Sequence, residues 1–208
     1  MKRGLDVIVS WVGLIALAPL FAIVAVLIKM DSAGPVFFRQ ERIGKRFRPF
    51  QIFKFRTMVQ DAPSRGGVLT SSGDARITRI GKILRQMKID ELPQLINVLQ
   101  GEMSLVGPRP EVPRYVELFR KHYEKILEVR PGITDLASLK YRDESAILAR
   151  SDNPEQEYVQ RILPDKLRLG EEYVRRSSLA LDLMLISKTI GVMIPTWNSE
   201  TAETKPRL

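Results

Sequence analysis

Apolar and polar positions divide the chain into one long apolar segment and a mixed remainder. Residues 7–28 contain no charged side chain, while Lys2 and Arg3 precede them and Lys29 follows them. A helix over these residues would be about 33 Å long, roughly the thickness of the bilayer core. The apolar run is too long for a signal peptide and no small-residue cleavage site follows it. We therefore expect the segment to enter lipid.

Two interpretations of this segment stay open, a transmembrane helix and a helix that enters one leaflet and returns. Pro19 lies in the middle, where it removes a backbone hydrogen bond and bends a helix. Basic residues flank both ends, so the positive-inside rule gives no orientation. Both features favour the returning helix without excluding the spanning one.

A β-hairpin is predicted next. Residues 36–38 and 50–55, rich in apolar and aromatic side chains, are typical of two strands around a turn near Gly44. Seven Lys or Arg and one Glu lie between Phe38 and Met58. This surface is either a solvated basic face or a contact for phosphates and lipid headgroups, at about 1 kcal/mol per base near an anionic membrane. Residues 60–75, rich in Gly and Ser, predict a mobile loop.

Helical spacing dominates the rest of the chain and makes the predicted fold α+β and mostly helical. One apolar stripe, flanked by bases, is followed directly by a second that ends at Gly101. Further helices are expected over residues 111–126, 154–176 and 178–194, the last apolar enough for the membrane interface. The two stripes consist of Ile80, Ile83, Leu84 and Met87, and of Leu92, Leu95, Ile96 and Leu99.

Composition narrows the chemistry. The formal net charge of +9 requires an anionic partner, which is nucleic acid, an acidic lipid surface or a phosphorylated substrate. The chain has no cysteine, which excludes disulfides, thiolate metal sites and cysteine nucleophiles. His122 is the only histidine. Chemistry must therefore depend on carboxylates and bases, with or without an oxygen-ligated metal.

The adjacent Asp90 and Glu91 are the main candidates. They follow a run of bases and precede Pro93, a residue typical of a first helical turn. Acidic residues in this position commonly do no more than complement the helix dipole. The alternative is catalytic: the dipole and the bases would lower a carboxylate's pKa and keep it ionised for attack on phosphorus. The neighbouring carboxylate could then hold Mg²⁺ or manage a proton.

Guanidinium groups suited to phosphate lie on both sides of this pair. Arg85 stands five residues before Asp90. Arg109 lies between two prolines in a stiff loop that follows Gly107. Planar guanidinium groups bind phosphates through paired hydrogen bonds, although this loop could also be a rigid turn and nothing more.

Taken together, these segments resemble the bacterial sugar transferase family, the monotopic phosphoglycosyl transferases. They occur in order and cover nearly everything up to about Trp197. The matching stretches are Lys2–Asp6, Phe37–Gly44, Phe53–Met58, Leu84–Arg85, Asp90–Val98, Met103–Pro110 and Arg130–Thr134.

The resemblance implies a two-step reaction. Asp90 would attack the sugar-proximal phosphate of a UDP-sugar and expel UMP. Polyprenyl phosphate would then attack the phosphosugar–Asp90 intermediate. Glu91 completes the family's acidic dyad, and Mg²⁺ is the expected cofactor, with Asp90 and Glu91 as its ligands. The residues expected to bind phosphate are Arg85, Arg109, Lys54 and Arg56.

The resemblance also implies an organisation and partners. Residues 1–30 would form a re-entrant membrane helix broken at Pro19, and residues 198–208 a flexible tail. Residues 31–197 would form one catalytic domain with interfacial helices, on the cytosolic face of the bacterial inner membrane. The expected partners are a UDP-sugar, polyprenyl phosphate, anionic lipid and a second copy in a homodimer, without nucleic acid.

Two departures from the family pattern bear on these expectations. Ala18 precedes Pro19 where a serine often stands, which makes the position of the bend less secure. Asp135 and Leu136 follow Gly-Ile-Thr where many members have Gly-Trp, so the choice of sugar or nucleotide can differ from theirs.

Two non-enzymatic alternatives remain. A membrane-tethered module that binds nucleic acid would explain the charge, but it needs neither Asp90-Glu91 nor the Arg109 loop, and the sequence has no helix-turn-helix, zinc finger or aromatic RNA-binding motif. An inactive scaffold of a polysaccharide assembly complex would keep the fold, but the intact acidic pair argues against it.

Overall fold

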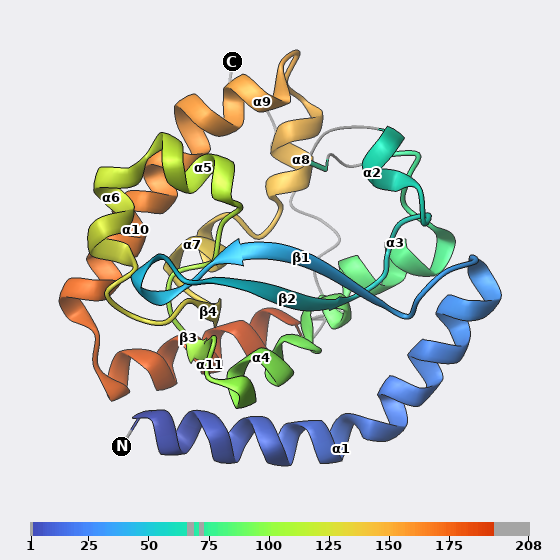
Figure 1. Ribbon diagram of the computed structural model, residues 1–208, viewed down its shortest axis with the longest axis horizontal. Helices are drawn as coiled ribbons and strands as arrows, with labels where there is room; N and C mark the ends of the chain where they lie inside the picture. Colours follow the sequence, from blue (N-terminus) through green and yellow to red (C-terminus); the bar gives the residue numbers. More distant parts are fainter. Residues whose placement is uncertain (1, 66–68, 71–72, 194–208) are drawn as a thin grey trace, which may run out of the picture.

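The computed structural model describes residues 2–65, 69–70 and 73–193. In it, a long helix lies beneath a small β-hairpin that is surrounded by shorter helices (Figure 1). Strands β1 (Phe37–Ile43) and β2 (Pro49–Phe55) pair antiparallel, with Phe37 opposite Phe55. This confirms the predicted hairpin and the α+β, mostly helical class. A second, parallel pair, β3 (Ser104–Val106) and β4 (Gly132–Thr134), was not predicted.

The predicted helices are present, with interruptions. Residues 111–126 contain a break at Phe119, and residues 154–176 include a π-helical turn at Tyr158–Ile162. The expected loop of residues 60–75 contains a short helix in its described part. Trp197 and the predicted tail lie outside the described residues. The helices are α1 (Lys2–Asp31), α2 (Ala62–Arg65), α3 (Arg79–Gln86), α4 (Gln94–Gln100), α5 (Pro113–Leu118), α6 (Arg120–Ile126), α7 (Leu136–Lys140), α8 (Glu144–Ala149), α9 (Pro154–Glu157), α10 (Leu163–Arg176) and α11 (Leu179–Met193).

Helix α1 is the one helix in the described part of the chain that is long and apolar enough to cross a membrane. Figure 1 shows that it runs along the bottom of the molecule and then bends upward. Pro19 lies inside the helix and accounts for a bend there, because its ring displaces the preceding turn. The exposed apolar side chains of α1 are Val7, Ile8, Val9, Trp11, Val12, Ile15, Ile23, Val26, Leu27 and Met30.

The start of α1 is anchored to strand β3. The Lys2 ammonium donates to the carbonyl oxygen of Val106 over 2.9 Å and to the Asp182 carboxylate of α11 over 2.6 Å. Asp6 is buried and accepts a hydrogen bond of 2.8 Å from the Ser104 hydroxyl. Since these groups are largely removed from water, the contacts fix where the apolar helix begins.

The end of α1 is anchored to the same folded unit. The Asp31 carboxylate accepts a hydrogen bond of 3.0 Å from the backbone N–H of Ile80, at the start of α3. The guanidinium group of Arg56 donates to the carbonyl oxygens of Ser32 (2.7 Å) and Ala33 (2.5 Å). Bases at a helix C-terminus satisfy its last carbonyl groups and complement its dipole.

The apolar side chains of α3 divide differently from the predicted stripe. Leu84 is buried against Val24 and Ile28 of α1, and Ile80 packs beside it. Ile83 and Met87, in contrast, are 51% and 49% exposed. The stripe identified the helix correctly, but only one edge of it meets the core.

Helix α4 is bound to the hairpin through a buried asparagine. The Asn97 side chain accepts a hydrogen bond of 2.9 Å from the backbone N–H of Phe53 and donates one of 2.8 Å to the carbonyl oxygen of Gln51. Its amide therefore pairs with strand β2 as a neighbouring strand would. This contact places the residues before α4 beside β2.

Candidate active site

The acidic pair lies in a tight connection between α3 and α4. Asp90 and Glu91 belong to a short 3₁₀ turn (Ile89–Glu91), and Lys88 before it has a left-handed backbone with φ of 57°. Within this turn Asp90 is only 8% exposed. The prediction that the pair lies just before a helix is confirmed, because α4 begins three residues after Glu91.

Glu91 is bound by bases from two distant segments. Its Oε1 accepts a hydrogen bond of 2.7 Å from Lys54 of strand β2. Arg109 forms a bidentate ion pair with Glu91. One guanidinium nitrogen donates to Oε2 over 3.0 Å, and the other donates to Oε1. These two bases hold the pKa of the Glu91 carboxyl well below its usual value in spite of burial. Glu91 is therefore a fixed negative charge.

The two bases respond to this burial in different ways. Desolvation lowers the pKa of Lys54, although the negative charge of Glu91 opposes the change. The same negative charge raises the pKa of Arg109 above its ordinary value. Arg109 therefore keeps its positive charge, which is the condition for a guanidinium group to bind phosphate.

Asp90 has a different environment. Its carboxylate has no hydrogen-bond donor among the residues that the structure describes. Burial, and then the neighbouring charge of Glu91, raise the pKa of Asp90 against the opposing charges of Lys54 and Arg85. The sequence-based expectation of a lowered pKa was therefore wrong, because burial and the like charge outweigh the bases.

Arg85 approaches the pair from α3. Its Nε donates a hydrogen bond of 2.8 Å to the hydroxyl of Thr57, which fixes the guanidinium group. Burial lowers the pKa of Arg85, and the negative charge of Asp90 is the largest opposing influence. A cation with this orientation beside a free carboxylate can receive the anionic group that the carboxylate attacks.

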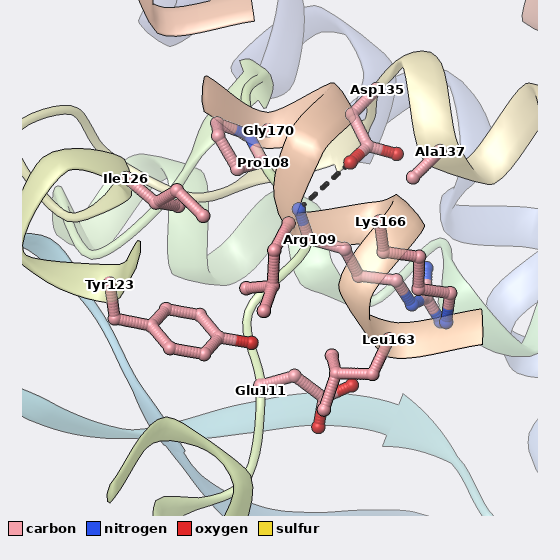
Figure 2. A pocket seen from close by; sticks show the side chains of 11 residues that line it. Pro108, Arg109, Glu111, Tyr123, Ile126, Asp135, Ala137, Leu163, Lys166 and Gly170 are labelled. Atoms are coloured by element: carbon pink, nitrogen blue, oxygen red, sulfur yellow. Dashed lines mark hydrogen bonds between the residues drawn. The ribbon is translucent and has the colours of Figure 1, made fainter. Parts of the chain in front are cut away.

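Arg109 is positioned by the loop that follows β3. A Cβ on Gly107 would lie 2.4 Å from the carbonyl oxygen of Arg130, so only glycine allows the two segments to approach this closely. The backbone N–H of Arg109 donates a hydrogen bond of 3.1 Å to the buried carboxylate of Asp135, drawn as a dashed line in Figure 2. The other oxygen of Asp135 accepts from the N–H of Ser138 over 2.6 Å and caps α7.

Asp135 is thus a residue that the sequence reasoning noted only as a departure from the family. The helix-capping pattern Asp-x-x-Ser was the available signal for its structural part.

A small cavity lies behind the same loop, and Tyr123 of α6 and Lys166 of α10 reach into it (Figure 2). The acidic pair does not line this cavity.

The structure brings together most of the predicted site residues. Lys54, Arg85 and Arg109 surround Asp90 and Glu91. Arg56 belongs elsewhere, because its guanidinium group binds the carbonyl oxygens at the end of α1. No phosphate contact of Arg56 follows from this geometry.

The acidic pair alone offers few ligands for a metal. No cluster of three or more His, Asp or Glu side chains suited to a metal exists among residues 2–65, 69–70 and 73–193. Both oxygens of Glu91 are already bound by bases, which leaves the Asp90 carboxylate as the open donor. This fits an ion such as Mg²⁺, which takes one or two carboxylates and completes its shell with water and substrate phosphates.

Comparisons with known proteins show which family the chain resembles. A family model described as "Bacterial sugar transferase" matches residues 1–196. The chain is 39% identical to an Aeromonas hydrophila protein named UDP-N-acetylgalactosamine-undecaprenyl-phosphate N-acetylgalactosaminephosphotransferase, over 93% of the chain and 44% of that protein. It is 38% identical to the UDP-glucose:undecaprenyl-phosphate glucose-1-phosphate transferase of Caulobacter vibrioides, over 95% of the chain and 71% of that protein.

The relatives differ in length. The chain spans less than half of the Aeromonas protein. It spans 93% of the exopolysaccharide production protein PSS of Rhizobium leguminosarum bv. phaseoli, to which it is 39% identical. The similarity therefore covers a unit that occurs both within longer proteins and nearly alone.

Proposed function

Because the chain belongs to the bacterial sugar transferase family, we propose that it transfers a sugar-1-phosphate from a UDP-sugar to undecaprenyl phosphate. This reaction would initiate the synthesis of an exopolysaccharide or another cell-surface glycoconjugate. The observation that carries the proposal is the unequal acidic pair, in which Glu91 is bound by two bases while Asp90 has no donor in the described part of the chain. A carboxylate nucleophile needs an unoccupied oxygen beside groups that bind phosphate.

In the first step, an oxygen of Asp90 attacks the sugar-proximal phosphorus of the donor. A bond forms between this oxygen and phosphorus, and the bond to the oxygen that bridges the two phosphates breaks. The bridging oxygen leaves with UMP, which takes the electron pair. Arg85 and Arg109 are the cations that would stabilise the charge that develops on the phosphates.

In the second step, a phosphate oxygen of the polyprenyl carrier attacks the same phosphorus. The bond from phosphorus to Asp90 breaks, and the carboxylate is restored with its electron pair. The product is a polyprenyl diphosphate sugar. Glu91 takes no part in bond formation here, since its role is to hold Lys54 and Arg109 in position.

We propose Mg²⁺ as the cofactor. Its ligands would be the Asp90 carboxylate and oxygens of the donor diphosphate, with Glu91 as a second carboxylate only where a base releases it. The ion would supply positive charge to the diphosphate. Arg85 and Arg109 supply the same kind of charge from the protein.

We also propose that α1 enters one leaflet of the bacterial inner membrane and returns. Both of its ends are bound by one folded unit, through Lys2 and Asp6 at the start and Asp31 at the end. A helix that crossed the bilayer would have its ends on opposite sides. Helix α11 exposes Leu179, Leu183 and Ile190, which suits an interfacial position. The catalytic groups would then face the cytosol, where a UDP-sugar is available.

The test is release of UMP from a panel of UDP-sugars by the purified protein in detergent, with Mg²⁺ and undecaprenyl phosphate. One sugar should give UMP release that depends on the carrier. The same UDP-sugar should exchange labelled UMP without carrier, because the first step is complete by itself. Asp90→Asn should abolish both. Full turnover by this variant would refute the covalent step, and a folded but silent wild-type protein would favour the scaffold.

A further inference from the structure

Helix α3 exposes apolar surface directly before the acidic pair. Ile83 and Met87 are 51% and 49% exposed and lie four residues apart, so they share one side of the helix. Met87 is three positions before Asp90 in the chain. Exposed apolar side chains that stand singly need no explanation, but a pair on the helix that leads to a reactive group is a candidate contact for a substrate.

The exposure of this pair is fixed by packing. The opposite side of α3 is held against α1, where Leu84 contacts Val24 and Ile28. The hydrogen bond from the Ile80 N–H to Asp31 fixes the start of α3 in the same way. Rotation of the helix to bury Ile83 and Met87 would break these contacts. The pair therefore stays outside while the protein is folded.

Helix α3 connects an exposed apolar part of α1 with the turn that carries the acidic pair. The half of α1 that packs against α3 exposes Ile23, Val26, Leu27 and Met30. Helix α3 then leads to the turn that carries Asp90. Because α3 contacts both α1 and this turn, Ile83 and Met87 are exposed on the element that joins the apolar surface of α1 to the carboxylate.

Bases accompany the apolar pair. Arg79 and Lys82 of α3 are exposed and have no acidic partner among the residues that the structure describes. Lys88 stands between Met87 and the acidic turn, and its positive charge acts on Asp90. From Met87 to Asp90 the order along the chain is thus an apolar side chain, a base and then the carboxylate. A polyprenyl phosphate has the same order of chemistry, with an apolar chain that ends in an anionic head.

We propose that Ile83 and Met87 form the subsite for the head-proximal isoprene units of the polyprenyl phosphate acceptor. This proposal rests on the proposed function and adds a location for one substrate. The acceptor is the occupant that fits, because its chain is covalently joined to the phosphate that must reach Asp90. A bulk phospholipid has no such requirement to approach the acidic pair.

The kinetic test compares the two half-reactions in detergent, so that membrane partitioning plays no part. In Ile83→Ser/Met87→Ser, KM for undecaprenyl phosphate should rise about tenfold, as expected when two side chains lose part of their apolar burial. Exchange of labelled UMP with the UDP-sugar, which needs no acceptor, should stay at the wild-type rate. The matched control is Leu118→Ser on α5, since Leu118 is 59% exposed and α5 lies on the opposite side of the molecule from α3 (Figure 1).

A binding test without turnover uses an isoprenyl phosphate with a photoreactive group on its first units. It should label the peptide that contains Ile83 and Met87, and undecaprenyl phosphate should suppress the labelling. Labelling that undecaprenyl phosphate does not suppress would mean contact with bulk lipid and would overturn the proposal. An unchanged KM in the double variant, or an equal loss in both half-reactions, would also overturn it. Failure of the proposed function differs, because the wild-type protein would then show no exchange at all.

Discussion

Replacement of each acidic residue by its amide should affect stability unequally, with a loss at Glu91 and no loss at Asp90. Glu91→Gln removes the charge that holds Lys54 and Arg109 while it preserves the shape of the side chain. Loss of one partner from a buried ion pair costs about 3–5 kcal/mol. The Arg109 and Glu91 side chains are 33% and 17% exposed, so solvent screens part of this loss. We therefore expect a value near the lower end, about 3 kcal/mol.

For a chain of this size, a loss of about 3 kcal/mol lowers the unfolding temperature by roughly 6–12 °C. The measurement is thermal unfolding of purified protein in one detergent at pH 7 and one heating rate. Asp90→Asn is the matched variant, because it removes one charge from the neighbouring position. Burial and Glu91 raise the pKa of Asp90, so its ionised form destabilises the fold and Asp90→Asn should unfold at a temperature equal to or above that of the wild type.

The pH dependence of folding stability gives a second check, because Glu91 and Asp90 should contribute to it with opposite signs. Glu91 has a lowered pKa in the folded state, so its stabilisation is complete above its unfolded pKa and is lost as pH falls through the folded value. The difference between wild type and Glu91→Gln should therefore shrink on acidification. Asp90 has a raised pKa, so its protonated form is favoured in the fold, and this stabilisation is lost as pH rises through the folded value. Equal destabilisation by both amides would refute the assignment of unequal environments.

Two further predictions concern the reaction. Asp135→Asn should lower kcat and leave the KM for the acceptor nearly unchanged, because an amide in the wrong orientation cannot accept from the Arg109 N–H. The nonpolar Asp135→Leu should lower kcat further. Wild-type kcat in both variants would contradict a positioning role for Asp135. The rate of UMP exchange should fall as the pH is lowered, with an apparent pKa above the ordinary 3.8 of an aspartate, since burial raises the pKa of Asp90. Exchange that persists undiminished below pH 3.8 would contradict attack by the ionised Asp90 carboxylate.

Local patterns were sufficient for the elements that depend on neighbours in the chain. The apolar and aromatic residues 50–55 predicted β2, and the strongly apolar residues 178–194 predicted α11. The pairing of β3 with β4 could not be predicted in this way. Each of these strands has three residues, and what joins them is the close approach of Gly107 and Gly132, which are far apart in sequence. Such short strands carry no periodic signal.

Side-chain environments were harder to predict than elements. The stripe of α3 placed Met87 with Leu84, but one edge of the stripe meets α1 and the other stays exposed. The spacing of apolar residues shows which side of a helix is apolar, but it does not show how much of that side a neighbouring helix covers. Arg56 illustrates the same limit, because only the fold shows that the end of α1 lies within its reach. The motif that contains Arg56 gave no sign of this contact.

The acidic pair shows why the site depends on the fold as a whole. Two adjacent carboxylates begin with nearly equal chemistry, and a reaction with one nucleophile needs them to differ. The sequence places bases before the pair, which would act on both acids alike. The difference arises because Lys54 comes from β2 and Arg109 from the loop after β3, and both bind the same residue. Glu91 therefore holds Lys54 and Arg109 in place, and the Asp90 carboxylate keeps the unbound oxygens that an attack on phosphorus requires.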